Sequence, residues 1–144
     1  MSDNVKISYE IGTTDSTIPL GLEVWVDDQK FFETDCVQPQ QLSIDVPDDE
    51  GEHELRFVLK HKRSEHTKID AAGNIVSDAT VIIKNLIFDE VPLGHVFTKL
   101  AEYHHDFNGT QNTTCAKFYG EMGCNGTLSL KFTSPIYVWL LENI

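Results

Sequence analysis

Five acidic side chains gather between residues 45 and 52: Asp45, Asp48, Asp49, Glu50 and Glu52. Ca²⁺ takes about six to eight oxygen ligands, and a short acidic turn supplies carboxylates and carbonyls within a few residues. The spacing differs from that of an EF-hand loop, and a run of acidic residues is commonly a solvated turn. Calcium binding at this turn is therefore a hypothesis that stands beside the simpler interpretation as a solvated turn.

A second group with metal-binding side chains is His104, His105 and Asp106, which Cys115 or Cys124 could join if the fold brought them close. Zinc prefers such nitrogen and sulfur ligands. Adjacent residues of a strand point to opposite faces, however, so the two histidines cannot share one side of a strand. The pattern does not favour a zinc site.

No complete catalytic set can be assembled from the sequence. A serine or cysteine nucleophile needs a base and an oxyanion hole, and the G-x-S-x-G motif is absent. Paired carboxylates could cleave glycosides, although chance pairs are frequent in a chain with 23 acidic residues. We predict no catalytic residues and no enzymatic activity, with a small hydrolase that uses acidic residues as one alternative.

Aromatic side chains are the other candidates for a binding site. Sugars stack on exposed aromatic faces, and Trp25 lies out of phase with the apolar residues of its strand, so it is a candidate for exposure. Tyr103 is a second candidate platform. Phe31, Phe32 and Trp139 are candidate contacts for a protein partner.

These residues must be positioned by short segments in which apolar and polar residues alternate, each closed by a cluster of Asp, Asn, Gly or Pro. That pattern predicts an all-β fold: an antiparallel, jelly-roll-like β-sandwich with at most one or two short helices. A chain of 144 residues is the size of one domain, so we expect a single domain over residues 1–144. The expected strands include residues 5–11, 20–26, 42–46, 53–60, 80–91, 117–119 and 127–132, with hairpin turns at 27–29 and 72–74.

Three segments each fit two interpretations of their secondary structure. The apolar residues of 80–91 fall on both parities, as in a strand that is covered on both faces or carries a bulge. Residues 96–107 fit a strand or one helical face, and strand with loop is favoured. The tail after Ser134 and Pro135 begins like a helix, and it either docks as a helical turn or closes the sandwich as a last strand.

The charge balance limits the partners. With 11 basic and 23 acidic residues, the net charge is −12, and this field repels nucleic acid and anionic membrane surfaces. No stretch approaches the length of a membrane span, and the first residues lack the basic and apolar regions of a signal peptide. We therefore expect no nucleic-acid or membrane partner, and synthesis in a cytoplasm without secretion. The three cysteines, Cys36, Cys115 and Cys124, are odd in number and predict no disulfide framework.

Several segments together resemble small proteins of tailed phages of marine cyanobacteria: TKIDAAGNIV at residues 67–76, IIKNLIFD at 82–89, HDFNG at 105–109, GCNGT at 123–127 and PIYVWLLEN at 135–143. The resemblance covers about half of the chain. The chain is also similar, more faintly, to calcium-dependent carbohydrate-binding β-sandwich modules. The first resemblance implies a protein associated with the virion, and the second implies a glycan ligand.

The leading hypothesis from the sequence is a non-enzymatic β-sandwich that acts through protein contacts, with its own copies or with other proteins of a phage particle. Its location would then be the virion. The alternative is a glycan-binding module, with or without calcium, that uses Trp25 or Tyr103.

Overall fold

The structure is a computed structural model of residues 1–144. It describes residues 4–14, 17–47, 51–61, 67–105, 114–118, 120–122 and 125–143, and all structural statements below concern these residues.

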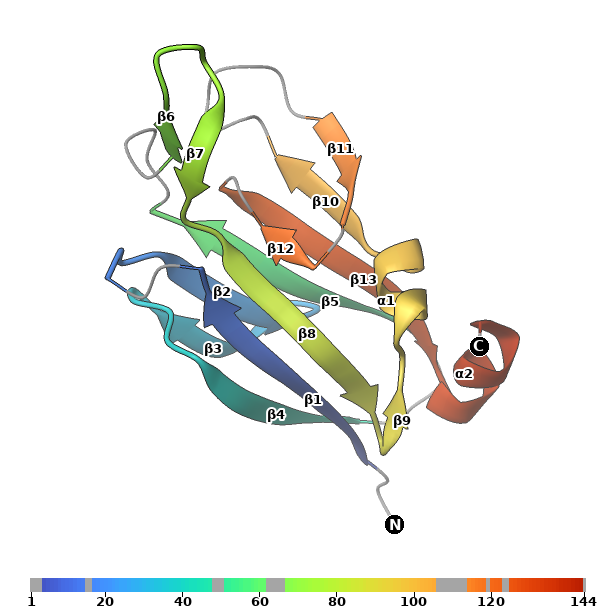
Figure 1. Ribbon diagram of the computed structural model, residues 1–144. Helices are drawn as coiled ribbons and strands as arrows, with labels where there is room; N and C mark the ends of the chain where they lie inside the picture. The colour runs from blue at the N-terminus through green and yellow to red at the C-terminus, as the bar shows by residue number, and fades with distance from the viewer. Residues whose placement is uncertain are drawn as a thin grey trace.

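Two antiparallel sheets face each other (Figure 1). The front sheet has the strand order β12-β8-β1-β4, and β9 pairs with the end of β8. Its strands are β1 (Asn4–Thr13), β4 (Gln40–Pro47), β8 (Val81–Phe88), β9 (Val91–Pro92) and β12 (Glu121–Met122).

The back sheet has the order β11-β10-β13-β5-β2-β3. Its strands are β2 (Gly21–Val26), β3 (Gln29–Thr34), β5 (Gly51–Lys60), β10 (Glu102–His105), β11 (Thr114–Lys117) and β13 (Gly126–Ser134). The longest pairing joins β13 to β5 over nine residue pairs, from Gly126 opposite Leu59 to Ser134 opposite Gly51. This pair forms the middle of the back sheet.

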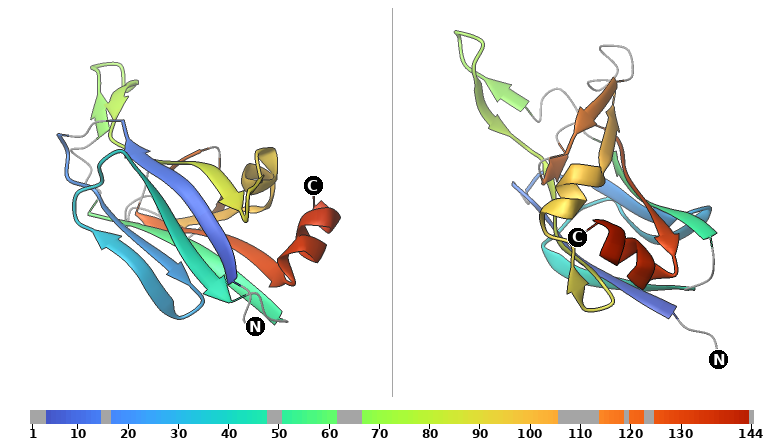
Figure 2. Two further views of the ribbon diagram at one scale, coloured as in Figure 1. Left: turned by 90° about the horizontal axis from the view of Figure 1, so that it is seen from below. Right: turned by 90° about the vertical axis from the view of Figure 1, so that its right-hand side faces the viewer.

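Three elements lie outside the two layers. A hairpin of β6 (Thr67–Ile69) and β7 (Ile75–Asp78) projects from one end of the sandwich (Figure 2). The helices α1 (His95–Leu100) and α2 (Ile136–Asn143) lie beside β13, away from that hairpin. Within the described residues, both helices are too short to cross a membrane.

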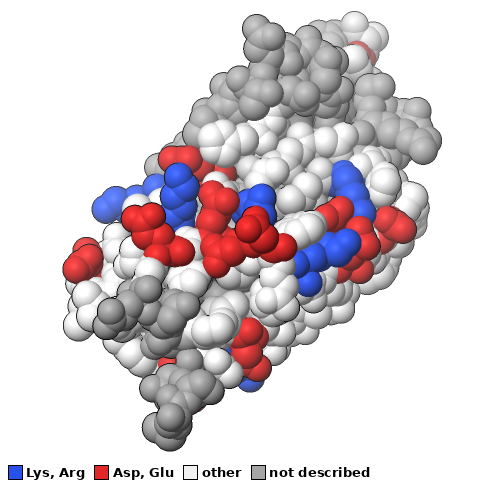
Figure 3. Space-filling model, turned by 180° about the vertical axis from the view of Figure 1, so that it is seen from behind, with Lys and Arg blue, Asp and Glu red and all other residues white. Residues whose placement is uncertain are grey.

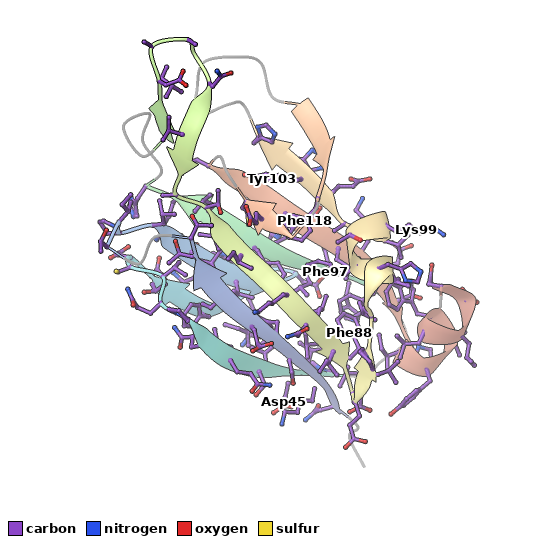
Figure 4. The ribbon with its side chains drawn as sticks, viewed as in Figure 1. Asp45, Phe88, Phe97, Lys99, Tyr103 and Phe118 are labelled. Atoms are coloured by element: carbon purple, nitrogen blue, oxygen red, sulfur yellow. The ribbon has the colours of Figure 1, made fainter. Side chains whose placement is uncertain are left out.

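The alternation of the strands places one face of each sheet in a shared core. In β1, Val5, Ile7 and Tyr9 are buried while the residues between them are more exposed. The same alternation gives β5 its inward residues Leu55 and Phe57. Aromatic side chains fill the space between the layers, among them Phe88, Phe97 and Phe118 (Figure 4). The predicted β-sandwich with two short helices is confirmed.

A bulge explains the apolar residues of both parities in β8. Two residues of β8, Asn85 and Leu86, stand opposite Tyr9, because the register shifts between Ser8 and Glu10. Asn85 has a φ of 54°, a conformation that asparagine tolerates better than most residues, and its amide donates to the Glu10 carboxylate. The residues of β8 that face the core are therefore Val81 and Ile83 before the bulge and Leu86 and Phe88 after it. Of the two alternatives that the sequence left open, the structure has the bulge.

Other segments differ from the prediction. Residues 95–100 form α1 rather than strand, because Val96 and Phe97 on one side of this short helix are buried in the core; the expected strand exists only as β10. The tail forms α2, the helical alternative. Of the expected strand at 117–119, Lys117 ends β11 and Phe118 lies outside a strand, while residue 119 is not among the described residues. Cys36 is free and exposed, while Cys124 lies outside the described residues, so the absence of a disulfide framework stays a prediction.

Tyr9 gives a direct test of the core packing. Its side chain is completely buried, its ring meets the Phe57 ring edge to face, and no described group lies within hydrogen-bond distance of its hydroxyl. Burial raises the pKa of Tyr9 well above its usual value. A buried hydroxyl without a partner costs about 1–3 kcal/mol. We therefore expect Tyr9→Phe to raise the free energy of unfolding by about 1 kcal/mol in urea titration.

The matched control is Tyr137→Phe, which removes a hydroxyl that donates to Asp89 over 2.5 Å. This variant should have unchanged or slightly lower stability. A Tyr9→Phe protein that is less stable than the parent would contradict the unpartnered state of the Tyr9 hydroxyl.

Candidate functional site

The turn between β2 and β3 is fastened to β5 by reciprocal hydrogen bonds. The Asp27 N–H donates to the Glu54 carbonyl over 2.9 Å, and the Glu54 N–H donates to the Asp27 carboxylate over 2.9 Å. Asp27 has a φ of 53°, a left-handed conformation that aspartate tolerates in tight turns. The guanidinium of Arg56 donates to the Asp27 carbonyl. This turn is therefore held in one position against the edge of β5.

His53 lies against the same carboxylate. Its Nδ1 is 2.7 Å from Asp27 Oδ2, and its ring stacks on Phe132 at 5.5 Å between centroids. Partial burial acts to raise the pKa of Asp27, but the hydrogen bonds from His53 and the Glu54 N–H, with the charges of His53 and Arg56, hold that pKa below its ordinary value. Asp27 is therefore ionised at neutral pH.

A hollow of about 490 Å³, here called the central hollow, opens beside this pair. Two cross-strand pairs of β5 and β13 are among its lining residues: Glu52 stands opposite Thr133, and Glu54 stands opposite Lys131. Its lining residues are acidic, basic, hydroxyl-bearing and aromatic: Asp27, Glu52, His53, Glu54, Lys131, Phe132, Thr133 and Trp139. Such a volume lies in the range of small-ligand sites, about 300–1,000 Å³.

Trp139 reaches the central hollow from α2. Its ring stacks on Phe88 at 5.8 Å and meets Phe132 at 6.3 Å, so it covers the end of the core between the two sheets. Its residue is only 6% exposed. Trp139 therefore offers the hollow a small apolar surface rather than a free ring face, and polar walls supply most of the hydrogen-bonding capacity.

Trp25 lies outside this hollow, on the outer face of the back sheet. Its Nε1 donates to Glu23 over 2.9 Å, and the cationic groups of Lys30 and Arg56 each lie over the ring, 5.7 Å from its centroid. Trp25 is thus partly exposed, as the sequence suggested, but it is already surrounded by charged side chains. Figure 3 shows acidic and basic residues interleaved across this face.

Lys60 organises the neighbouring charges on that face. Its Nζ lies 2.7 Å from Glu33 and 3.1 Å from Glu23, the residue that accepts from Trp25. Hydrogen bonds from Lys60 and Lys30 lower the pKa of Glu33 to about 2. The network fixes the surroundings of Trp25 and competes with a sugar for its ring.

The other predicted aromatic contacts are partly or fully buried. Phe31 and Phe32 are half-buried and pack against the core. Phe32 stands opposite Val24, and Phe31 lies at the register shift between β2 and β3. Tyr103 is 6% exposed, and its ring lies 4.7 Å from that of His105. Tyr103 is therefore not an exposed platform, because its inward position in β10 places it opposite buried Leu128.

The described residues include two of the five predicted calcium ligands, Asp45 and Glu52. Asp45 is exposed on β4 of the front sheet (Figure 4), and Glu52 is exposed on β5 of the back sheet. Asp48, Asp49 and Glu50 lie outside the described residues. Within the described part of the chain, no group of three or more His, Cys, Asp or Glu side chains could hold a metal ion. Calcium at this turn stays a prediction.

Sequence reasoning missed the Asp27–His53 pair. The sequence pattern marks Asp27 only as a turn residue and His53 only as the first residue of a strand. The two residues are 26 positions apart, and only the pairing of β2 with β5 brings them together. Lys131 and Thr133 were missed for the same reason: alternation marks them as outward-facing residues of β13 and says nothing of their neighbours.

Comparisons with known proteins show the fold. No family model and no curated protein matches this chain. Its fold is similar to a structure described as "vCBM60 in complex with galactobiose", with a TM-score of 0.52 and 11% identity over 87% of this chain and 96% of the other. A second structure of vCBM60, from work on two families of calcium-dependent carbohydrate-binding modules, has a TM-score of 0.50 and 11% identity, and covers 88% of this chain and 89% of the other.

The Asp27–His53 pair should make stability depend on acid. The pKa of Asp27 is lower in the folded protein than its ordinary value of 3.8. Asp27 therefore contributes to the stability of the folded protein above pH 3.8, and this contribution is lost as the pH falls through the lowered pKa. We expect the difference in unfolding free energy between the parent and Asp27→Asn to shrink as the pH falls from about 6 to about 2. Urea titrations across this range measure it.

Asp28→Asn is the matched control, since it removes the same charge from the next position of the same turn. Its stability difference should vary less with pH. A difference between the parent and Asp27→Asn that is constant across the range would contradict the charged hydrogen bonds assigned to Asp27.

Proposed function

We propose that this protein is a glycan-binding module and that the central hollow holds the sugar. The observation that carries the proposal is the lining of the hollow. Carboxylates and the His53 ring accept hydrogen bonds from sugar hydroxyls, while Lys131 and Thr133 can donate. Trp139, which is 6% exposed, adds a small apolar surface to this polar lining, whereas Phe132 is 1% exposed and belongs to the core.

The similarity of fold supports this proposal. Both similar structures are described as carbohydrate-binding modules, and one of them contains galactobiose. Binding without catalysis agrees with the sequence prediction. A small hydrolase that uses acidic residues is the alternative at the same place, because Asp27, Glu52 and Glu54 all line the hollow.

The test is binding of the purified protein to a panel of soluble oligosaccharides, measured by calorimetry with calcium and again with a chelator. We expect at least one glycan to bind. Glu52→Gln should weaken its binding about tenfold, the equivalent of about 1.4 kcal/mol, because one charged acceptor is removed from the wall of the hollow. The two calcium conditions show whether the acidic turn at residues 45–52 contributes.

Asp35→Asn is the control variant. It removes the carboxylate of Asp35, which follows the C-terminal end of β3. This side chain is 82% exposed and does not line the central hollow. It should bind like the parent. Equal affinities of Glu52→Gln and the parent for every bound glycan would place the sugar elsewhere, and the surroundings of Trp25 would be the next surface to test.

We propose protein contact in a phage particle as a second candidate, because α2 has an exposed apolar face. Tyr137 and Val138 are about half exposed and Leu141 is 84% exposed, although Ile136, Trp139 and Leu140 of the same helix are buried. Exposed apolar patches of this kind are typical of interaction surfaces. This face supports association more directly than Phe31, Phe32 or Trp139 do.

Light scattering of the native protein tests the second candidate. We expect a mass above that of one chain, and Leu141→Asp should shift the mass toward one chain while the circular dichroism spectrum stays unchanged. A parent protein that is monomeric at high concentration would remove self-association from consideration and leave the glycan function unaffected.

A further inference from the structure

The outer edge of β4 has no pairing partner among the described residues (Figure 1). β4 is the last strand of the front sheet, and it pairs with β1 over eight residue pairs without a register shift. An open edge presents a row of N–H and C=O groups to which a further strand can bind. Proteins commonly block such edges with charged side chains, bulges or very short strands.

The other strands at the ends of the two sheets are blocked in these ways. β3 has a register shift against β2, and its Lys30 and Glu33 form an ion pair at 3.2 Å. β11 has four residues and β12 has two. β4 has eight residues, and Asp45 is its one charged side chain. Of these edges, β4 is therefore the one best suited to accept another strand.

The backbone hydrogen bonds of β1 show which groups of β4 point to this open edge. A strand residue directs its N–H and its C=O to the same neighbouring strand, and the next residue directs both the other way. The Lys6 carbonyl accepts from the Asp89 N–H, just beyond β8, so Lys6 points away from β4 and Ile7 points toward it. Ile44, the partner of Ile7, therefore bonds to β1. By alternation, the residues whose backbone groups point to the open edge are Gln41, Ser43 and Asp45.

The open edge is complementary to a second copy of itself. If two β4 strands run antiparallel about a two-fold axis through Ser43, each Gln41 stands opposite Asp45 of the second copy, and each Leu42 stands opposite Ile44. An amide that donates to a carboxylate and a pair of aliphatic side chains are favourable cross-strand neighbours, and no like charges meet. The backbone groups at the open edge then exchange about six hydrogen bonds.

Two prolines mark the ends of this pairing. Pro39 comes directly before β4 and Pro47 is its last residue, and the same axis sets Pro39 of one copy opposite Pro47 of the other. Proline has no N–H, so it ends a ladder without leaving a donor unpaired. The pairing therefore has a defined length, and a two-fold contact closes after two copies.

Apolar side chains lie beside the open edge. Leu42 of β4 and Phe31 of β3 are only partly buried against the core. A hollow of about 460 Å³ opens between these two strands, and Phe31, Val46 and Pro47 are among its lining residues. A second copy bound at β4 lies against this side of the sandwich, where it removes apolar surface from water.

The charge near the open edge is small although the whole chain is acidic. The net charge of −12 opposes association in general. On β4, however, Asp45 is the one charged residue, and Lys6 stands opposite it on β1. The repulsion between two copies is therefore weak at this edge.

We propose that β4 pairs with β4 of a second copy of this chain, antiparallel about Ser43, so that the two front sheets form one continuous sheet across a symmetric dimer. The inference goes beyond the proposed glycan function and does not depend on it. It also concerns a surface different from the exposed face of α2.

Light scattering in the Leu141→Asp background separates this dimer from contact through α2. We expect the Leu141→Asp protein to have the mass of two chains. Adding Ser43→Pro should weaken the dimer at least about tenfold, with the circular dichroism spectrum unchanged. Because the Ser43 N–H points to the open edge, proline there removes no hydrogen bond to β1.

A second pair of variants makes the test independent of proline. Ser43→Lys sets two lysines opposite each other at the axis, so it should weaken the dimer several-fold, and added salt should reduce this effect. Ser8→Lys is the matched control, because Ser8 is the cross-strand partner of Ser43 on β1 and does not lie at the edge. In the same background, Ser8→Lys should associate like Leu141→Asp alone.

Hydrogen exchange followed by NMR detects the pairing directly. As the concentration of the Leu141→Asp protein rises, the amides of Gln41, Ser43 and Asp45 should exchange more slowly. The amides of Leu42 and Ile44 bond to β1 and should be protected at every concentration. This alternation is specific to strand pairing at β4.

Two results would overturn the proposal. One is a Leu141→Asp protein with the mass of one chain at every concentration. The other is a dimer in which the amides of Gln41, Ser43 and Asp45 exchange as fast as in dilute protein, since its contact would lie elsewhere. Neither result bears on the glycan proposal, which is tested by calorimetry.

Discussion

The carboxylate of Asp27 is the contact on which the candidate site depends. One oxygen accepts from the Glu54 N–H and the other meets His53, while the Asp27 backbone is bonded to β5 at its N–H and to Arg56 at its carbonyl. A hairpin turn at the end of a sheet is ordinarily free to move, because few contacts hold it. Here the turn is joined to β5 by both its backbone and its side chain, which holds Asp27 in place beside the central hollow.

The opposite wall depends on the packing of α2. This helix has no acidic residue in its first turn and no basic residue in its last, so it has little electrostatic support as an isolated helix, and eight residues are too few to be stable alone. It is held by Ile136, Trp139 and Leu140, and the Trp139 ring lies between Phe88 of the front sheet and Phe132 of the back sheet. The same ring therefore closes the core and borders the central hollow, so that stability and the shape of the site are coupled there.

The polar residues that line the central hollow and the apolar residues of the core belong to opposite parities of the same strands. In β5, Leu55 faces the core and Glu52 and Glu54 face outward; in β13, Phe132 faces the core and Lys131 and Thr133 face outward. The register that pairs these two strands sets Glu52 opposite Thr133 and Glu54 opposite Lys131. A slip of one residue would exchange the two faces, so burial of the core also fixes the polar groups of the site.

The sequence by itself determined the β-sandwich, most strand positions and the hairpin at 27–29, because these follow from alternation and turn residues within a few positions. It made Trp25 a candidate for exposure without deciding its surroundings. It could not decide between helix and strand at residues 95–100, where burial of Val96 and Phe97 against other elements settles the conformation. It could not place Tyr103 inside the core. It also could not assemble the central hollow, since Asp27 meets His53 and Trp139 meets Phe88 only through strand pairing and packing between residues far apart in the chain. Local pattern fixes which face a residue occupies, whereas the tertiary structure alone decides which residue it meets there.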